Sequence, residues 1–186
     1  RPARTIVKYN KWVGCMAVRK DGAVASWDWS GGVNVWKEGE VSTLRKKDEW
    51  MVHSLAWLKD GTLAVGMDGK AEMWKDGCCV KTLEVCGSCY TLCALPDGSF
   101  LIGTHTSYKE IKHWRDGKCV REPKGHVGYV MSLIRLKNGN IASGSSDTTI
   151  KIWDLEKGKC LHTLQGHTDF VYALAELPDG RIASSS

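Results

Sequence analysis

The strongest constraint on the fold of this chain is a repeat with a period of about 40 residues. A Trp recurs at intervals of 38, 40 and 39 residues, and a Gly in a turn signal recurs at intervals of 39, 37, 41 and 41. These markers are Trp36, Trp74, Trp114 and Trp153, and Gly22, Gly61, Gly98, Gly139 and Gly180. Helical repeats usually have periods near 33 or 34, so the spacing favours small β units. Because no sustained helical periodicity interrupts them, the sequence predicts an all-β chain.

The segment from Gly125 to Asp154 is the most complete copy of the repeat. Asn138-Gly139 predicts a two-residue hairpin turn, because both central residues of the turn that matches strand twist have positive φ. β-type runs flank this turn and follow it, and they predict strands at 129–133, 141–143, 150–153 and 160–164. Strands joined by such short turns predict a four-stranded antiparallel sheet in chain order.

Gly125-His126, Asp147 and Trp153-Asp154 give this segment a specific resemblance to a WD repeat, one blade of a β-propeller. The resemblance implies a hydrogen-bonded chain of side chains formed by His126, Ser143, Asp147 and Trp153. A closed polar network is cheaper to bury than any of its members alone. We interpret the four residues as structural, because a catalytic Ser would have to be exposed at a cleft rather than placed mid-strand beside an indole.

The other repeats keep this pattern unevenly. The aligned network positions hold Tyr9, Ser26, Ser30 and Trp36 in the first repeat, Asp48, Val65, Asp68 and Trp74 in the second, and Val85, Ile102, Thr106 and Trp114 in the third. Replacing both partners of a buried hydrogen bond by apolar groups can be nearly neutral. The predicted network is therefore complete only in the fourth repeat, whereas the β-propeller fold is expected throughout.

The alignment predicts one partial propeller over residues 1–186, with four full repeats and the first half of a fifth. Its expected parts are an outer strand of a preceding blade at 1–7, blades at 8–44, 45–83, 84–122 and 123–165, and half a blade at 166–186. Such a chain does not close into a ring by itself. We expect it to be part of a larger propeller, or else to be completed by another chain.

The resemblance implies that partners bind on the narrow face of the propeller, near the central channel. Three positions in each repeat are expected there: the residues on either side of the first strand's leading Val or Cys, and the residue before the tight-turn Asp. Nine of these 14 positions are aromatic or Met, although Phe, Trp, Tyr and Met make up only 21 of 186 residues. Together with two His, the predicted binding residues are Trp12, Trp29, Met51, His53, Met67, Tyr90, His105, Tyr129, Met131, Phe170 and Tyr172.

A surface rich in aromatic residues and Met suits protein recognition, because it offers large contact areas with few rotamers to freeze. We therefore predict a non-catalytic scaffold that binds a protein or peptide. The alternative for these side chains is that they plug the channel. A second alternative is binding of nucleic acid or an acidic partner through residues 1–47, which hold ten Lys or Arg against four Asp or Glu. Scattered charges of this kind more often form a solvated surface.

An enzyme is disfavoured, because the sequence contains no nucleophile elbow, phosphate-binding loop or zincin motif, and we expect no cofactor. Zinc binding by Cys86, Cys89 and Cys93 is also disfavoured, since no second ligand pair follows at zinc spacing. The eight Cys are interpreted as reduced thiols. With no membrane span or secretion signal in the sequence, we expect an intracellular protein in the cytoplasm, with the nucleus as the other possibility.

Overall fold

The computed structural model describes residues 12–28, 32–45, 51–105 and 110–186, and all regular structure within them is β. Four sheets have four strands each, and one has two. We number these sheets as blades one to five in chain order. Blade one contains β1 (Val13–Val18), β2 (Val24–Asp28), β3 (Val33–Lys37) and β4 (Glu40–Arg45). Blade two contains β5 (Val52–Trp57), β6 (Leu63–Met67), β7 (Lys70–Lys75) and β8 (Cys78–Glu84).

Blades three to five continue the same pattern. Blade three contains β9 (Ser88–Ala94), β10 (Phe100–His105), β11 (Ile111–Arg115) and β12 (Lys118–Arg121). Blade four contains β13 (Val130–Arg135), β14 (Ile141–Ser145), β15 (Ile150–Asp154) and β16 (Lys159–Leu164), and blade five contains β17 (Ala173–Glu176) and β18 (Ile182–Ser185). Each blade is an antiparallel meander in chain order, so the predicted fold class, an all-β propeller with four-stranded blades, is confirmed.

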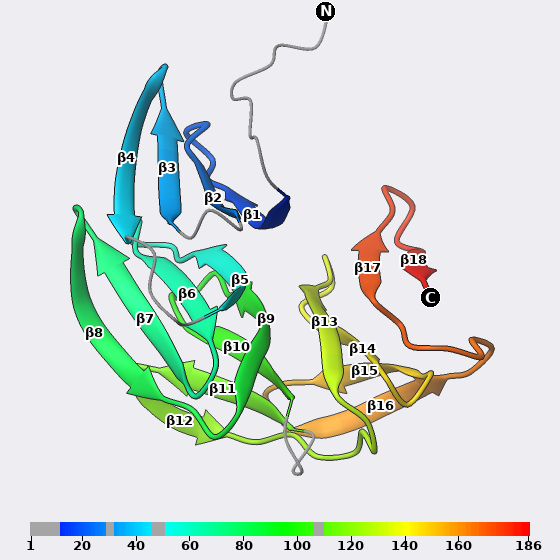
Figure 1. The fold of residues 1–186 in the computed structure, drawn as a ribbon. Helices are drawn as coiled ribbons and strands as arrows, with labels where there is room; N and C mark the ends of the chain where they lie inside the picture. The colour runs from blue at the N-terminus through cyan, green and yellow to red at the C-terminus, as the bar shows by residue number, and fades with distance from the viewer. Residues whose placement is uncertain (1–11, 29–31, 46–50, 106–109) are drawn as a thin grey trace, which may run out of the picture.

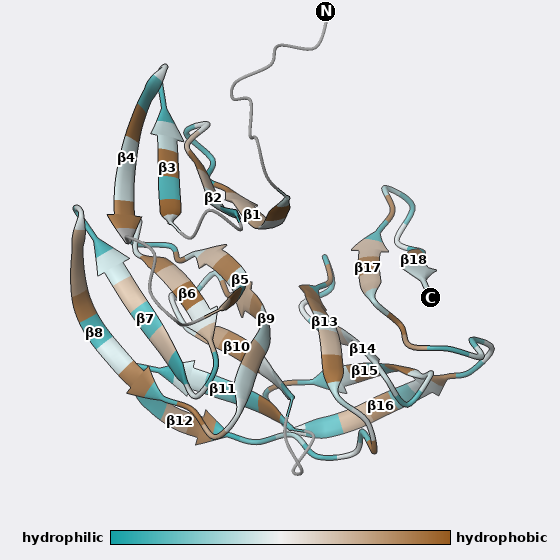
Figure 2. Cartoon of the chain, viewed as in Figure 1, coloured by the Kyte–Doolittle hydropathy of each residue, from teal (hydrophilic) through white to brown (hydrophobic). Residues whose placement is uncertain are grey.

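The blades follow one another along an arc, with β1, β5, β9, β13 and β17 on its inner side (Figure 1). Each junction between neighbouring blades is filled by a separate hydrophobic cluster to which both blades contribute. In the junction between blades three and four, for example, Leu101 and Ile111 pack with Ile141 and Trp153. The hydrophobic residues concentrate on the strands rather than on the turns (Figure 2). The core of this fold is therefore a series of interfaces between sheets.

Glycine at one repeated position allows these interfaces to close. Gly66, Gly103 and Gly144 lie near the ends of β6, β10 and β14, next to the following blade. A Cβ at Gly144 would lie 2.7 Å from a side-chain carbon of Val171, and one at Gly103 would lie 2.8 Å from a side-chain carbon of Val130. These distances are shorter than a van der Waals contact, so any larger residue would push the blades apart.

The hairpin turn at Asn138-Gly139 differs from the sequence prediction. Gly139 has a φ of 92°, but Asn138 does not have a positive φ. The amide of Gly139 donates to the carbonyl of Leu136, and the amide of Leu136 donates to the carbonyl of Asn140. The loop is thus one turn followed by a left-handed Gly, the longer hairpin connection in which only the Gly needs positive φ. The prediction relied on the Asn-Gly dipeptide alone, whereas the turn type of a hairpin also depends on the number of residues in its loop.

Candidate functional site

A β-bulge in the innermost strand sets the geometry of the candidate site. In blade two, Val52 pairs with Met67 and Ser54 with Gly66, so His53 is an extra residue without a partner across the ladder. Tyr90 in blade three and Met131 in blade four occupy the same extra position. A bulge of this kind re-aims a side chain at the rim of a sheet. In blades two, three and four, the bulge therefore places one predicted binding residue at the same end of the inner strand.

Four of the predicted residues form a continuous stack of rings across three blades, which we call the ring ladder: His53, Tyr90, His105 and Tyr129. The rings of His53 and Tyr90 are stacked with centroids 4.8 Å apart, and those of Tyr90 and His105 are 4.9 Å apart. The rings of His105 and Tyr129 are 3.6 Å apart. All four residues are half-buried, so each keeps part of its surface accessible. Neighbouring rings hold one another in place across the junctions between blades.

Asp68 extends the ring ladder, although it was predicted to belong to the buried network. One carboxylate oxygen of Asp68 lies 2.8 Å from Nε2 of His53. Burial alone would raise the pKa of this carboxyl, but hydrogen bonds from Ser88 and His53 outweigh that effect and the pKa is lowered. The ladder therefore ends at a carboxylate that stays ionised near neutral pH.

The displacement of Asp68 also explains an error in the prediction for Met67. Met67 is fully buried, with 0% of its surface exposed, so it does not lie on the binding face. The paired residues Gly66 and Ala71 have four residues between them, whereas the equivalent pair in blade four has five. The prediction took the residue before Asp68, but in this shorter turn that residue is one position too early. Met67 therefore lies on the side of β6 that packs in the core.

The other predicted binding residues are distributed more widely. Trp12 and Met51 are exposed, Trp12 by 85%, and Met131 is half-buried. Phe170 and Tyr172 are exposed, and their rings lie 5.9 Å apart at the start of blade five. Trp29 lies outside the described residues. The structure thus brings Phe170 and Tyr172 together as a second aromatic pair that is separate from the ring ladder.

In blade four, His126, Ser143, Asp147 and Trp153 form one hydrogen-bonded chain. His126 places Nδ1 2.8 Å from Asp147 Oδ2 and Nε2 2.7 Å from Ser143 Oγ, and Trp153 Nε1 donates to the same Ser143 oxygen at 2.7 Å. Hydrogen bonds from Thr149, His126 and Val127 outweigh burial and lower the pKa of Asp147 to about 2, whereas burial lowers the pKa of His126.

These pKa shifts fix the direction of the hydrogen bonds in the chain. The ionised carboxylate of Asp147 can only accept, so His126 holds its proton on Nδ1 and donates it to Asp147. Nε2 of the neutral ring then accepts the hydroxyl proton of Ser143. Ser143 is fully buried and engages both Trp153 and His126, so it is not a nucleophile exposed at a cleft. The arrangement is that of a structural network.

The equivalent Trp residues of the other blades meet different partners. Trp36 donates to Ser26 at 3.2 Å, whereas Trp74 donates to Glu72 at 3.0 Å because an apolar Val65 occupies the Ser position. In blade three, where Val85 and Ile102 are apolar and buried, Trp114 Nε1 is a buried donor without a hydrogen-bond partner among the described residues. The remaining aligned positions, Tyr9, Ser30, Asp48 and Thr106, lie outside the described residues.

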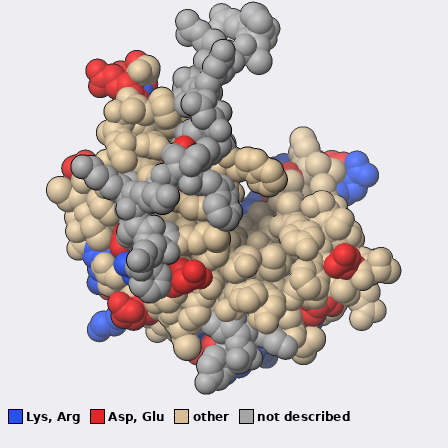
Figure 3. All heavy atoms as spheres, viewed as in Figure 1, with Lys and Arg blue, Asp and Glu red and all other residues tan. Residues whose placement is uncertain are grey.

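On the face seen in Figure 3, charged side chains lie mostly toward the outer edge, and other residue types form most of the surface between them. The described residues include no helix that is long and apolar enough to cross a membrane. All eight Cys are free; Cys89 and Cys93 are buried, whereas Cys86 is exposed. Burial raises the pKa of Cys89 to about 12 and that of Cys93 to about 11, so both remain protonated thiols.

Comparison with known proteins supports the same architecture. Residues 117–154 and 158–186 match the family described as "WD domain, G-beta repeat". A search of curated protein sequences found no match. A chain in a structure titled "Crystal Structure of Mitotic Checkpoint Complex" superposes with a TM-score of 0.81 at 24% identity, covering 92% of this chain and 56% of that chain. The WD40 β-propeller domain of Doa1 gives a TM-score of 0.68 at 23% identity, covering 96% of this chain and 77% of that chain.

The described chain thus spans a little over half the length of the first of these structures. The matched repeats include the residues of the hydrogen-bonded network in blade four. The superpositions extend the blade architecture beyond the matched repeats. Blade topology and structural similarity agree on the β-propeller fold, and residues 117–154 and 158–186 of this chain match the WD-repeat family.

Proposed function

We propose that this chain is a non-catalytic scaffold that binds a protein or peptide partner on the narrow face, with the ring ladder as the centre of the contact. The observation that carries the proposal is the stack of His53, Tyr90, His105 and Tyr129 at one end of the inner strands. Aromatic side chains at such a surface offer apolar area and a polar edge together, and they are enriched among the residues that dominate binding energy. Stacking reduces the entropy that these rings would lose on binding.

Three further features support binding over plugging of the channel. Each ring of the ladder remains partly exposed. The exposed pair Phe170 and Tyr172 at the start of blade five, and the exposed Met51 just before β5 in blade two, add accessible area. Asp68, 46% of whose side chain is exposed, supplies a carboxylate that selects for a hydrogen-bond donor or cation on the partner. The free thiols agree with an intracellular setting for this interaction.

Site-specific photocrosslinking tests the location of the contact. A photoreactive phenylalanine analogue replaces Tyr90 or Tyr129 in one set of proteins and His162, on the exposed outer strand β16, in a control. The proposal predicts that the two ladder positions crosslink the same protein and that the control position does not. Crosslinks to nucleic acid, or crosslinks only from His162, would contradict it.

A further inference from the structure

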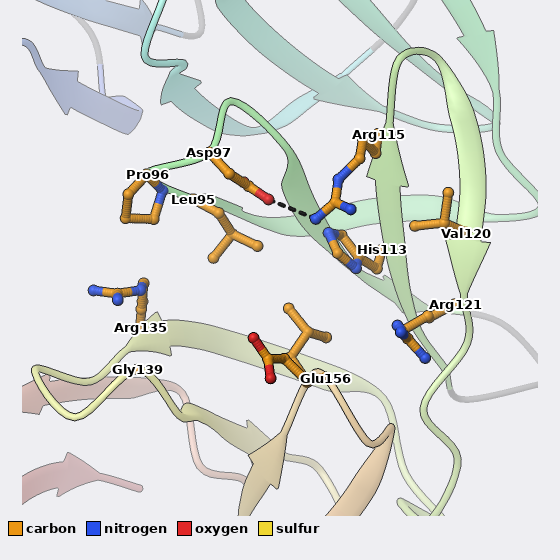
Figure 4. Close-up of a pocket in the computed structure, with 11 residues that line it drawn as sticks. Leu95, Pro96, Asp97, His113, Arg115, Val120, Arg121, Arg135, Gly139 and Glu156 are labelled. Atoms are coloured by element: carbon orange, nitrogen blue, oxygen red, sulfur yellow. Dashed lines mark hydrogen bonds and ion pairs between the residues drawn. The ribbon is translucent and has the colours of Figure 1, made fainter.

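Two cavities lie at the opposite end of the inner strands from the ring ladder. The first has a volume of about 770 Å³ and opens between the hairpins that follow β1, β5 and β9. The second has a volume of about 750 Å³ and opens between blades three and four (Figure 4). The two share Leu95, Pro96 and Arg135 in their lining, so they adjoin where the hairpin after β9 begins. We call the two cavities together the hairpin groove.

Accessible apolar side chains form part of the wall in both cavities. In the first cavity, Val18 is 68% exposed, and Trp57 and Leu58 are half-buried. In the second cavity, Val120 is 47% exposed and Leu155 is half-buried. Covering such surface stabilises a complex by about 25 cal/mol for each Å² of apolar area that leaves water. Each cavity therefore offers a contact for an apolar side chain of a partner.

The apolar wall is mainly aliphatic. Among the described lining residues, only Trp57 has an indole or phenyl ring. The guanidinium carbon of Arg19 lies over this ring, 4.6 Å from its centroid, and Trp57 Nε1 donates to the carbonyl of Ala17 at 3.3 Å. One face of the ring is therefore already covered, whereas nucleic acid bases need a series of open aromatic faces on which to stack. The lining suits aliphatic side chains instead.

Ion pairs within the chain neutralise three of the four carboxylates that line the hairpin groove. These pairs have N···O distances between 2.6 and 3.1 Å, and they are Asp21–Arg19, Asp60–Lys75 and Asp97–Arg115. The fourth carboxylate is Glu156, in the second cavity, which forms no ion pair with any residue that the structure describes. Most of the negative charge in the groove is thus already matched by the chain itself.

Four cations of the hairpin groove are unmatched within the described part of the chain: Lys20, Lys59, Arg121 and Arg135. Lys20 and Lys59 line the first cavity, Arg121 lines the second, and Arg135 lines both. Figure 4 shows Arg121 and Arg135 on opposite sides of the second cavity. A segment that crosses both cavities therefore meets a free cation at each end and Arg135 between them. Such a surface complements a partner with several negative charges.

We propose that the hairpin groove binds an acidic protein segment that also carries aliphatic side chains. The carboxylates of the segment pair with Lys20, Lys59 and Arg135, and its aliphatic side chains contact Leu58 and Val120. A basic segment would be repelled by the free cations, and an acidic segment without apolar side chains would leave the wall uncovered. The proposal is independent of binding at the ring ladder, because the groove is lined by the other end of the inner strands.

Fluorescence anisotropy with defined probes tests the chemistry of the partner. The main probe is a short labelled peptide in which Glu and Leu alternate. It is compared with the same peptide carrying Ser in place of every Leu, the same peptide carrying Lys in place of every Glu, and a thymidine oligonucleotide. The Glu-Leu peptide is expected to bind most tightly. Equal binding of the Glu-Ser peptide, equal binding of the Lys-Leu peptide, or tighter binding of the oligonucleotide would overturn the proposal, as would no binding of the Glu-Leu peptide.

Substitutions locate the bound peptide on the molecule. Arg135 is exposed, so Arg135→Gln is expected to fold normally and to weaken binding of the Glu-Leu peptide about fivefold, whereas Arg181→Gln, which removes the same charge outside the groove, is not. Val120→Ser is expected to weaken binding about threefold, with Val80→Ser, at the equivalent exposed position of β8, as its control. Unchanged affinity in either groove variant, an equal loss in its control, or loss of binding in Tyr90→Ala would overturn the proposal.

Discussion

Removal of one hydroxyl group from the network of blade four provides a sharp test of its structural role. Ser143 is fully buried; it accepts the indole proton of Trp153 at 2.7 Å and lies 2.7 Å from Nε2 of His126. Ser143→Ala removes only the oxygen and leaves a donor and an acceptor buried without partners. Trp153 is 1% exposed and His126 is 7% exposed, so water cannot readily replace the lost group.

The expected cost follows from these two orphaned groups. Each unsatisfied buried polar group costs about 1 to 3 kcal/mol. Two such groups give a loss of about 2 to 6 kcal/mol in the free energy of unfolding. Blade three sets a useful comparison, because the fold already tolerates one unpaired indole at Trp114. The larger predicted loss at Ser143 arises because the His126 ring is orphaned as well.

Equilibrium unfolding in urea measures this loss. Ser42→Ala is the matched control, since Ser42 lies on the exposed outer strand β4 and its substitution should change stability by less than about 0.5 kcal/mol. Ser143→Ala should lower the unfolding free energy by at least about 2 kcal/mol with an unchanged slope against urea concentration. A loss of less than about 1 kcal/mol would refute the reasoning that both partners depend on this hydroxyl.

Three further predictions concern the packing between blades, the pH dependence of stability and the ring ladder. Gly144→Ala should destabilise the chain by about 1 to 3 kcal/mol in the same urea assay, because the added Cβ would meet Val171; an unchanged midpoint would contradict this. The lowered pKa values of His126 and Asp147 mean that the unfolded chain binds protons first, so stability should fall as pH drops below about 6.5 and fall again below about 4. Urea midpoints that stay constant between pH 7 and pH 3 would exclude that linkage. Asp68→Asn should move the His53 ring signals in NMR at a fixed pH, because it replaces the carboxylate that lies against that ring; unchanged ring signals would rule out the contact.

Much of the fold could be predicted from the sequence because the repeat encodes it locally. Each blade forms from consecutive strands joined by short turns, so periodic Trp and turn residues were sufficient to predict the sheets. The blade four network was implied by the resemblance to a WD repeat, and that resemblance could be recognised because His126, Ser143, Asp147 and Trp153 all lie in one repeat.

The candidate site was predicted less completely, because it depends on contacts between blades. His53 and Tyr90 were identified by their place beside the leading residue of the strand, but their stacking requires the bulge and the packing of β5 against β9. Met67 was misplaced and Asp68 was given the wrong role because a turn shorter by one residue shifts the register. A comparison of turn lengths between repeats could have revealed that shift.

The cavity between blades three and four could not be inferred from any single repeat. His113 occupies a position that holds Ile152 in blade four, and in sequence it resembles an ordinary core substitution. Its hydrogen bond with Ser99, which itself donates to Asp97 in the hairpin after β9, becomes apparent only in the structure. The same strand alternation that builds the core thus places a polar side chain toward a cavity whose other wall comes from the next blade.

The affinity of ladder variants for the crosslinked partner tests the central claim most directly. Isothermal titration calorimetry would compare the wild-type chain with Tyr90→Ala and Tyr129→Ala, and with His162→Ala on the outer strand as a control. At least one of the two ladder variants should lose about 2 kcal/mol or more of binding free energy, roughly a thirtyfold weaker Kd, while the control binds normally. Full-strength binding by both ladder variants, with folding intact, would contradict a partner site centred on the ring ladder.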